Sequence, residues 1–237
     1  MRARILLIFL GLLLLIPAIG NLGADTLQLS PALDISLGTL SLGSFIFGEV
    51  IQPTPPPQEL LPRESLPFPD HLSINPYNES LDLTSDITQY ASFLLPGLLI
   101  FLSPEQDPLT LGILYTQSVF FSYGMKNIIK SLFPKPRPYC YYSTTGDEEE
   151  DYRSFPSGHT TMAFTGAGFL IASLLILNPD SPWVLPLAGT SVALAIGTAV
   201  LRVASGNHYI TDVLAGAALG TLSGAIIPLL HRQREEN

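Results

Sequence analysis

The sequence predicts an all-α integral membrane protein, a bundle of about six transmembrane helices when the N-terminal apolar segment is counted. Hydrophobic residues make up 47% of the 237 residues and charged residues only 13%, whereas soluble domains usually carry about 25% charged residues. The mean hydropathy of the chain is +0.36. Its apolar residues gather in long runs separated by Pro-containing polar stretches, which is typical of helices that cross a bilayer.

Residues 1–24 have the pattern of a secretory signal peptide. Arg2 and Arg4 precede an apolar run over residues 5–16, and small residues follow at residues 18–24. The alternative is an N-terminal anchor helix that is not cleaved. Either interpretation exports the chain that follows.

Residues 25–83 form a separate extracytoplasmic segment that is rich in proline. Prolines at this density block regular helices and favour an extended linker or a capping loop. Within the segment, Leu33–Ile51 is apolar but contains several glycines as well as Asp34 and Glu49. We expect an interfacial or partly buried helix there, and a membrane span is the alternative.

Five longer apolar runs define a helical core over residues 84–231, followed by a polar tail at residues 232–237. The runs are Thr84–Leu102, Leu109–Leu132, Ser157–Leu177, Val184–Ala204 and Tyr209–Leu230. Each approaches the ~20 residues that cross the hydrocarbon core of a bilayer as a helix. Small residues recur in the last three runs, and they allow membrane helices to pack closely.

The order of the crossings predicts which face of the membrane each loop occupies. If residues 5–19 cross first and Leu33–Ile51 stays outside, the basic C-terminal residues share the cytoplasm with Arg2 and Arg4, as the positive-inside rule prefers. The polar clusters described next then face the exterior, which in a bacterium is the periplasmic side of the inner membrane. If Leu33–Ile51 also spans, these clusters face the cytoplasm instead.

Three polar clusters lie at the ends of apolar runs, where charged groups are costly and usually functional. The first holds Lys130 and Arg137, the second Ser157, Gly158 and His159, and the third Arg202, His208 and Asp212. Three converging cations stabilise the charge of a transferring phosphoryl group. Backbone N–H groups at a helix N-terminus also bind phosphate. Together the clusters predict a phosphoryl-transfer site.

The two histidines provide a proton donor and a nucleophile. His159 is suited to protonate a leaving oxygen because the ordinary pKa of histidine lies near neutrality. His208 and Asp212 are four residues apart, so on one helix face the carboxylate can accept a hydrogen bond from one ring nitrogen. The other lone pair then points outward, as in an oriented nucleophile. Taken singly, the same residues also fit interfacial anchors, a helix cap and a structural ion pair.

Other patterns exclude several classes of protein and site. The net charge of −9 argues against a nucleic-acid partner. Cys140 is the only cysteine, which excludes an intramolecular disulfide and a cysteine-based metal site, and we expect it to be a packing residue. The acidic run Asp147–Asp151 is expected to be a solvated loop, and a role in gating the site is the alternative.

The three clusters, in order, resemble the signature of the type-2 phosphatidic acid phosphatase and vanadium haloperoxidase superfamily. The matching patterns are Lys130-x6-Arg137–Pro138, then Pro156–Ser157–Gly158–His159, then Arg202-x5-His208-x3-Asp212. The resemblance covers residues 84–230. It departs at Leu201, where the third motif of the family usually has Ser before the Arg, and this puts the fine geometry near the phosphate in doubt.

The resemblance implies a lipid phosphatase that cleaves a phosphate or diphosphate monoester. It implies that His208 attacks phosphorus and forms a phosphohistidine, that Asp212 orients His208, and that His159 protonates the leaving group and then activates water. The phosphoryl oxygens would be held by Lys130, Arg137, Arg202 and the amides of Ser157 and Gly158. The family requires no divalent metal, so no cofactor is expected.

Substrate identity stays open, with membrane lipids and a lipid phosphate as the expected partners. Candidates are phosphatidic acid, phosphatidylglycerol phosphate, polyprenyl diphosphate and the phosphates of lipid A. One alternative function is a vanadate-dependent haloperoxidase, which the many apolar runs disfavour. The other is a non-catalytic phospholipid-binding membrane protein, which the presence of every charged motif residue disfavours.

Overall fold

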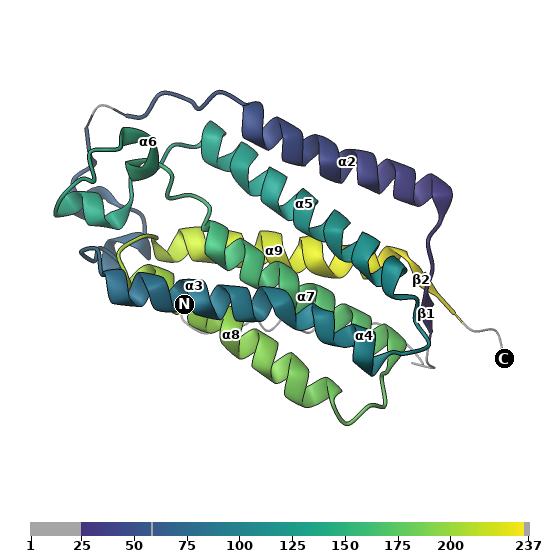
Figure 1. Cartoon of the computed structure of the whole chain (residues 1–237). Helices are drawn as coiled ribbons and strands as arrows, with labels where there is room; N and C mark the ends of the chain where they lie inside the picture. Colours follow the sequence, from purple (N-terminus) through teal and green to yellow (C-terminus); the bar gives the residue numbers. More distant parts are fainter. Residues whose placement is uncertain (1–24, 58, 235–237) are drawn as a thin grey trace.

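The computed structural model describes residues 25–57 and 59–234, and there it confirms an all-α bundle (Figure 1). The long helices are α2 (Pro31–Val50), α3 (Glu79–Leu94), α5 (Pro108–Leu132), α7 (Gly158–Leu177), α8 (Val184–Ala204) and α9 (Ile210–Leu230). The shorter elements are the 3₁₀ turns η2 (Arg63–Ser65), η3 (Asp70–Leu72), η4 (Leu95–Leu98) and η5 (Pro138–Tyr141), the short helices α4 (Leu99–Leu102) and α6 (Glu148–Asp151), and the strands β1 (Thr26–Leu27) and β2 (Arg232–Gln233). The predicted signal or anchor segment, residues 1–24, lies outside the described residues.

Five helical segments in the described part of the chain are long and apolar enough to cross a bilayer. They are α2, the continuous stretch Glu79–Leu102 formed by α3, η4 and α4, and the helices α7, α8 and α9. The predicted run Leu109–Leu132 also forms a helix, α5, but it is not one of these five. Polar side chains, Lys126 and Lys130 among them, lower its hydropathy where it approaches the site.

Helix α7 lies at the centre of the bundle and packs against α3, α5, α8 and α9 (Figure 1). Nearly all of its residues are buried. The approach of α9 is close because glycines face α7: a Cβ added at Gly220 would lie 2.2 Å from the carbonyl oxygen of Thr161. The predicted packing through small residues is therefore confirmed for this helix pair.

The segment Leu33–Ile51 forms a partly buried helix, as expected, and the choice between an interfacial helix and a membrane span stays a prediction. As α2 it lies along α5, with Ser41, Ser44 and Gly48 buried in the contact. A Cβ added at Gly124 of α5 would lie 2.3 Å from the backbone of Ser44. Glycines and serines therefore serve helix packing here, and the same helix is apolar enough to span.

The strand pair limits the topologies that the chain can adopt. Thr26 pairs with Gln233 and Leu27 with Arg232 in antiparallel register, so the start of the described chain and its C-terminal end lie together (Figure 1). These two ends must share a face of the membrane. An outward crossing by the first segment and a cytoplasmic C-terminus are therefore incompatible, although we expected both.

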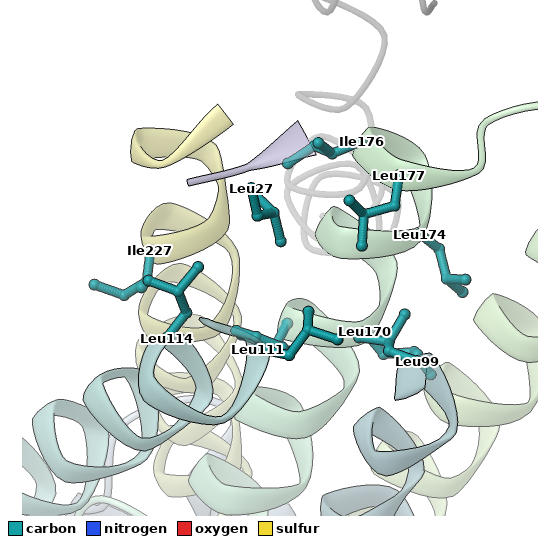
Figure 2. Close-up of a cluster of buried hydrophobic side chains, with 10 residues drawn as sticks. Leu27, Leu99, Leu111, Leu114, Leu170, Leu174, Ile176, Leu177 and Ile227 are labelled. Carbon is teal, nitrogen blue, oxygen red and sulfur yellow. The ribbon is translucent and has the colours of Figure 1, made fainter. Parts of the chain in front are cut away.

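A hydrophobic cluster closes this end of the bundle, where α7 ends (Figure 2). Its buried residues come from β1, α4, α5, α7 and α9, and they are Leu27, Leu99, Leu111, Leu114, Phe169, Leu170, Leu174, Ile176, Leu177 and Ile227. Gln106 ties β1 to this cluster, because its side-chain amide donates to and accepts from the backbone of Leu27, both at 2.9 Å. The cavity lined by the predicted polar residues lies at the other end of the same helices.

The proline-rich stretch between α2 and α3 covers that other end, as predicted for a capping loop. Its Asp70 is buried and accepts hydrogen bonds from the Thr211 N–H at 2.9 Å and from the Thr211 hydroxyl at 2.7 Å. The Asn78 N–H donates to the carbonyl of Ser205 at 3.1 Å. The loop is thereby fastened to the start of α9 and the end of α8.

Candidate active site

The residues of the three predicted clusters gather at one end of the bundle. Lys130 lies in the last turn of α5, Arg137 precedes η5, Ser157 caps α7, Gly158 and His159 begin α7, Arg202 lies in the last turn of α8, His208 precedes α9, and Asp212 lies in its first turn. Lys130, Arg137, Gly158, His159, Arg202 and His208 line a cavity of about 980 Å³. The predicted convergence of the cations and histidines is confirmed as geometry.

His208 is buried and held in one tautomer by the backbone. Its side chain lies against the carbonyl oxygen of Ser154, 2.7 Å from Nδ1. Because a carbonyl only accepts, Nδ1 carries the proton and Nε2 keeps its lone pair. Burial, together with the nearby cations Arg137 and Arg202, holds the pKa of His208 well below its usual value. The ring is therefore neutral near pH 7, as a nucleophile must be.

Asp212 acts on His208 through Ser154 and not by the direct hydrogen bond that we expected. Its Oδ2 lies 3.7 Å from His208 Nδ1, which is beyond hydrogen-bond distance. The same oxygen accepts instead from the Ser154 hydroxyl at 2.6 Å and from the Tyr209 N–H at 2.9 Å. The helical i,i+4 geometry fails because α9 begins only at Ile210, after the N-cap Tyr209.

Lys135 completes this arrangement, and the sequence analysis missed it. Its ammonium lies 2.6 Å from Asp212 Oδ1 and 2.7 Å from Asp70 Oδ2, and 3.0 Å from the Thr211 hydroxyl. A fully buried carboxylate such as Asp212 requires a cation or several donors. Lys135 lies between Lys130 and Arg137 of the first cluster, so the need of Asp212 for a cation could have identified it from the sequence.

Two of the three cluster cations are paired with carboxylates. Arg202 forms an ion pair with Asp82 of α3, and its Nε has no hydrogen-bond partner among the described residues. Arg137 forms an ion pair with Glu150 and donates from Nη1 to Asn207 Oδ1 at 3.1 Å. These carboxylates stand where phosphoryl oxygens would accept from the same guanidinium groups.

Lys130 is largely buried at the cavity wall and donates to the backbone carbonyl of Arg153. Lys126, one turn earlier on α5, also lines the cavity and approaches the start of α7, where a Cβ on Gly158 would lie 3.3 Å from its side chain. Its ammonium lies 3.8 Å from the centroid of the Tyr123 ring. The wall around Gly158 is therefore cationic beyond the predicted residues.

The acidic run is more structured than the solvated loop that we favoured. Asp151 is 3% exposed and accepts from the Tyr139 hydroxyl at 3.0 Å and the Thr145 hydroxyl at 2.7 Å. Glu150 reaches Arg137, and both Asp147 and Glu149 line the cavity. The run thus closes one side of the site, and part of it is buried because hydrogen-bond donors surround it.

His159 lies in the cavity wall with its own carboxylate partner. Its Nε2 is 2.6 Å from Oδ1 of Asp86, one turn after Asp82 on α3. Neither aspartate was selected from the sequence, although two carboxylates at the head of an apolar run are unusual in a membrane helix. Two carboxylates four residues apart, and therefore on one helix face, were the signal that could have identified them.

The predicted phosphate-binding amides are only partly available. The Ser157 N–H donates to the Asp212 carbonyl at 3.1 Å, and Ser157 is fully buried beneath the cavity. Gly158, the first residue of α7, does line it. The phosphate-binding role of the Gly158 amide stays a prediction, whereas Ser157 is the helix cap, since its hydroxyl accepts from the Thr160 N–H at 3.4 Å.

Two further residues were singled out from the sequence. Leu201 is not among the residues that line the cavity. Cys140 is buried in η5, and burial raises the pKa of its thiol to about 11, as fits a packing residue.

Within residues 25–57 and 59–234 no three His, Cys, Asp or Glu side chains gather in a metal-binding group. Metal independence of the reaction stays a prediction.

Comparison with known proteins gives one family and several relatives, among them the three that follow. The sequence profile of the PAP2 superfamily matches residues 111–236. "Probable diacylglycerol pyrophosphate phosphatase 1" of Schizosaccharomyces pombe is 37% identical over 92 residues, 36% of this chain and 31% of the relative. "Bacitracin transport permease protein BcrC" of Bacillus licheniformis is 30% identical over 138 residues, 57% of this chain and 63% of the relative. "Lipid A 1-phosphatase" of Porphyromonas gingivalis is 35% identical over 103 residues, 44% of this chain and 20% of the relative.

No solved structure matches the chain. The chain spans less than two thirds of the length of each of these relatives. The family match nevertheless covers more than half of the chain and includes all three polar clusters. This chain belongs to the PAP2 superfamily.

Proposed function

We propose that this protein is a membrane-embedded lipid phosphatase that hydrolyses a phosphate or diphosphate monoester through a phosphohistidine at His208, without a metal. One observation carries the proposal: a neutral imidazole, fixed through Nδ1, lies in the wall of a cavity that it shares with Arg137 and Arg202. An unprotonated ring nitrogen beside fixed cations is what nucleophilic attack on a phosphoryl group requires.

The first chemical step forms the phosphoenzyme. Nε2 of His208 attacks phosphorus, the bond from phosphorus to the leaving oxygen breaks, and His159 gives its proton to that oxygen. In the second step His159 removes a proton from water, the hydroxide oxygen attacks phosphorus, and the phosphorus–nitrogen bond breaks to release phosphate. Each histidine returns to its starting protonation state, so no other proton donor is needed.

The surrounding groups hold charge and orientation during both steps. Arg137, Arg202 and Lys130 stabilise the phosphoryl oxygens electrostatically, which is the largest contribution expected in phosphoryl transfer. Asp212 fixes Ser154 by hydrogen bonding, and the Ser154 carbonyl fixes the His208 ring. Asp212 is thus a positioning residue in this mechanism.

A lipid substrate fits the surroundings of the cavity. Its walls include residues of α2, α3 and α5, so the site opens beside helices whose outer faces are apolar. Phe47 and Val50 of α2 and Ile87 and Tyr90 of α3 are exposed near this end. Acyl or polyprenyl chains can lie along such surfaces while the phosphate reaches Arg202. The names of two relatives, which specify diacylglycerol pyrophosphate and lipid A, support this substrate class.

Phosphate release from a panel of lipid phosphates tests the proposal. The purified protein in neutral detergent should release phosphate in the presence of EDTA, and vanadate should inhibit as a phosphate mimic. His208→Ala should abolish release, whereas His71→Ala, which changes an exposed histidine outside the cavity, should not. Full activity in His208→Ala, or strict dependence on a divalent metal, would refute the mechanism.

We further propose a location in a bacterial inner membrane with the site on the exterior, periplasmic face. Helix α9 begins beside His208 and ends before Arg232, so the site and the C-terminus lie on opposite faces. Arg232 and Arg234 favour a cytoplasmic C-terminus by the positive-inside rule, which leaves the site outside.

Cysteine labelling tests this orientation. In a Cys140→Ser background, an impermeant thiol reagent added to intact cells should label Thr144→Cys, in the loop before α6. It should not label Asp180→Cys, in the loop between α7 and α8 at the opposite end. The reverse pattern would place the site in the cytoplasm.

A further inference from the structure

Helix α3 places two carboxylates on groups that the proposed reaction requires. Asp82 pairs with Arg202, and Asp86 lies 2.6 Å from Nε2 of His159. The aspartates are four residues apart, so they share one face of α3, and both line the cavity. One carboxylate therefore holds a phosphate-binding cation and the other holds the proton donor.

Asp82 accepts from the Arg202 guanidinium in the way that a phosphoryl oxygen would. The Arg202 side chain is 4% exposed and also donates to the Ser85 hydroxyl at 3.3 Å, while its Nε lacks a partner among the described residues. Carboxylate and phosphate oxygens accept from the same guanidinium N–H groups. A phosphoryl oxygen that accepts from Nη1 of Arg202 must therefore displace Asp82.

The two carboxylates can be displaced without movement of the helix. The backbone at the start of α3 is anchored, because the Asn75 side chain and the Asn78 N–H donate to the end of α8, each at 3.1 Å. The side chains of Asp82 and Asp86 are 24% and 39% exposed. Asp82 also accepts from the Tyr77 hydroxyl at 2.9 Å and from the Asn207 side-chain amide at 3.1 Å, so its rotation away from Arg202 must break these hydrogen bonds as well.

We propose that Asp82 and Asp86 make the site selective for the dianionic group of phosphomonoesters and diphosphates over the single charge of phosphodiesters. The inference rests on the proposed function and assigns the residues that select its substrate class. A dianion supplies two negative charges in place of the two carboxylates, one beside Arg202 and one beside His159, whereas a phosphodiester supplies only one. Common bilayer phospholipids are phosphodiesters, so this selection excludes the abundant lipids around the site.

Binding of anions, measured without turnover, tests the selectivity. The full-length protein in neutral detergent is titrated by calorimetry with inorganic phosphate and, separately, with short-chain phosphatidylglycerol as the phosphodiester. The variants are Asp82→Asn and Asp86→Asn. The matched control is Glu79→Gln, which neutralises an exposed carboxylate in the first turn of the same helix, outside the cavity.

Asp82→Asn should bind the phosphodiester about tenfold more tightly than the wild type. This factor is expected if the Asp82–Arg202 ion pair leaves only about one tenth of the wild-type protein able to bind the phosphodiester. Asp86→Asn should shift in the same direction, and Glu79→Gln should match the wild type. The ratio of phosphate to phosphodiester affinity should fall in both aspartate variants.

Two results would overturn the inference. Weaker binding of both anions by Asp82→Asn would mean that Asp82 only positions Arg202. An unchanged affinity ratio in both variants would mean that the carboxylates do not select. The predicted binding pattern in a protein that hydrolyses no lipid phosphate would support the selectivity and refute the proposed function, so the two failures are distinguishable.

Discussion

A single methyl group added at Gly220 should push α9 away from α7, the two helices that bring His159 and His208 together. A Cβ there would lie 2.2 Å from Thr161 O and 2.9 Å from Phe164 Cβ, whereas ordinary contact begins at 3.4 Å. Gly220→Ala must therefore move α9 from α7 by about 1 Å, and overpacking of this kind costs about 1–3 kcal/mol. For a protein of this size the Tm in detergent should fall by roughly 2–12 °C.

The same displacement should reduce activity more than stability. His159 lies in the first turn of α7 and His208 directly precedes α9. A misplacement of about 1 Å between reacting groups can cost about 10²-fold in rate, so phosphate release should fall by that order in protein that is still folded. Both quantities are measured on one preparation, by thermal unfolding and by phosphate release.

Gly189→Ala is the matched control. Gly189 lies on an exposed face of α8, and a Cβ there meets nothing within 4 Å. The substitution gains about 1 kcal/mol of helix propensity, so the Tm should stay the same or rise. If Gly220→Ala had the Tm and the activity of Gly189→Ala, the packing argument would be refuted.

Three further predictions concern the network beneath His208. Lys135→Met leaves Asp70 and Asp212 without their shared ammonium; because the lysine is 23% exposed, we expect a loss of about 1–3 kcal/mol, measured by thermal unfolding, with partial recovery when Asp70→Asn is added. Asp212→Asn should lower kcat far more than it raises KM, because Asp212 is fully buried and does not line the cavity; steady-state kinetics that showed a change in KM alone would contradict this. The pKa of His208 is held well below its usual 6.5, so the unfolded chain binds a proton first as the pH falls. The free energy of unfolding should then decrease below pH ~6.5 by up to about 1.4 kcal/mol per pH unit, and His208→Gln should flatten that part of a Tm-against-pH curve.

The sequence predicted the parts of the fold and site that depend on local pattern. Long apolar runs identified the core helices, because covering a bilayer with satisfied backbone groups requires about 20 apolar residues. Residues such as Lys130, Arg202 and His208 stood out because charge at the end of an apolar run is costly. Their convergence followed from simple alternation of the helices.

The parts that were missed depend on which distant segments meet. Lys135 gains its role only because the proline-rich loop brings Asp70 to the start of α9. Asp82 and Asp86 matter only because α3 lies beside α7 and α8. These contacts join residues that are far apart in the chain, so the periodicity of the sequence does not predict them.

One expectation failed for a local reason that the structure makes clear. His208 and Asp212 lie on opposite sides of a helix start, so the helical spacing rule did not apply to them. The glycines and serines of α2, by contrast, form its contact surface with α5, and this close packing of small residues accounts for the partly buried helix that we expected.

Trapping of the phosphoenzyme tests the central claim most directly. The protein is mixed with a lipid phosphate labelled with ³²P at its terminal phosphate and quenched in alkali, in which phosphohistidine survives. The account predicts label on His208 in the wild type and none in His208→Ala. Phosphate release by the wild type with no label on His208, or with equal label in His208→Ala, would contradict it.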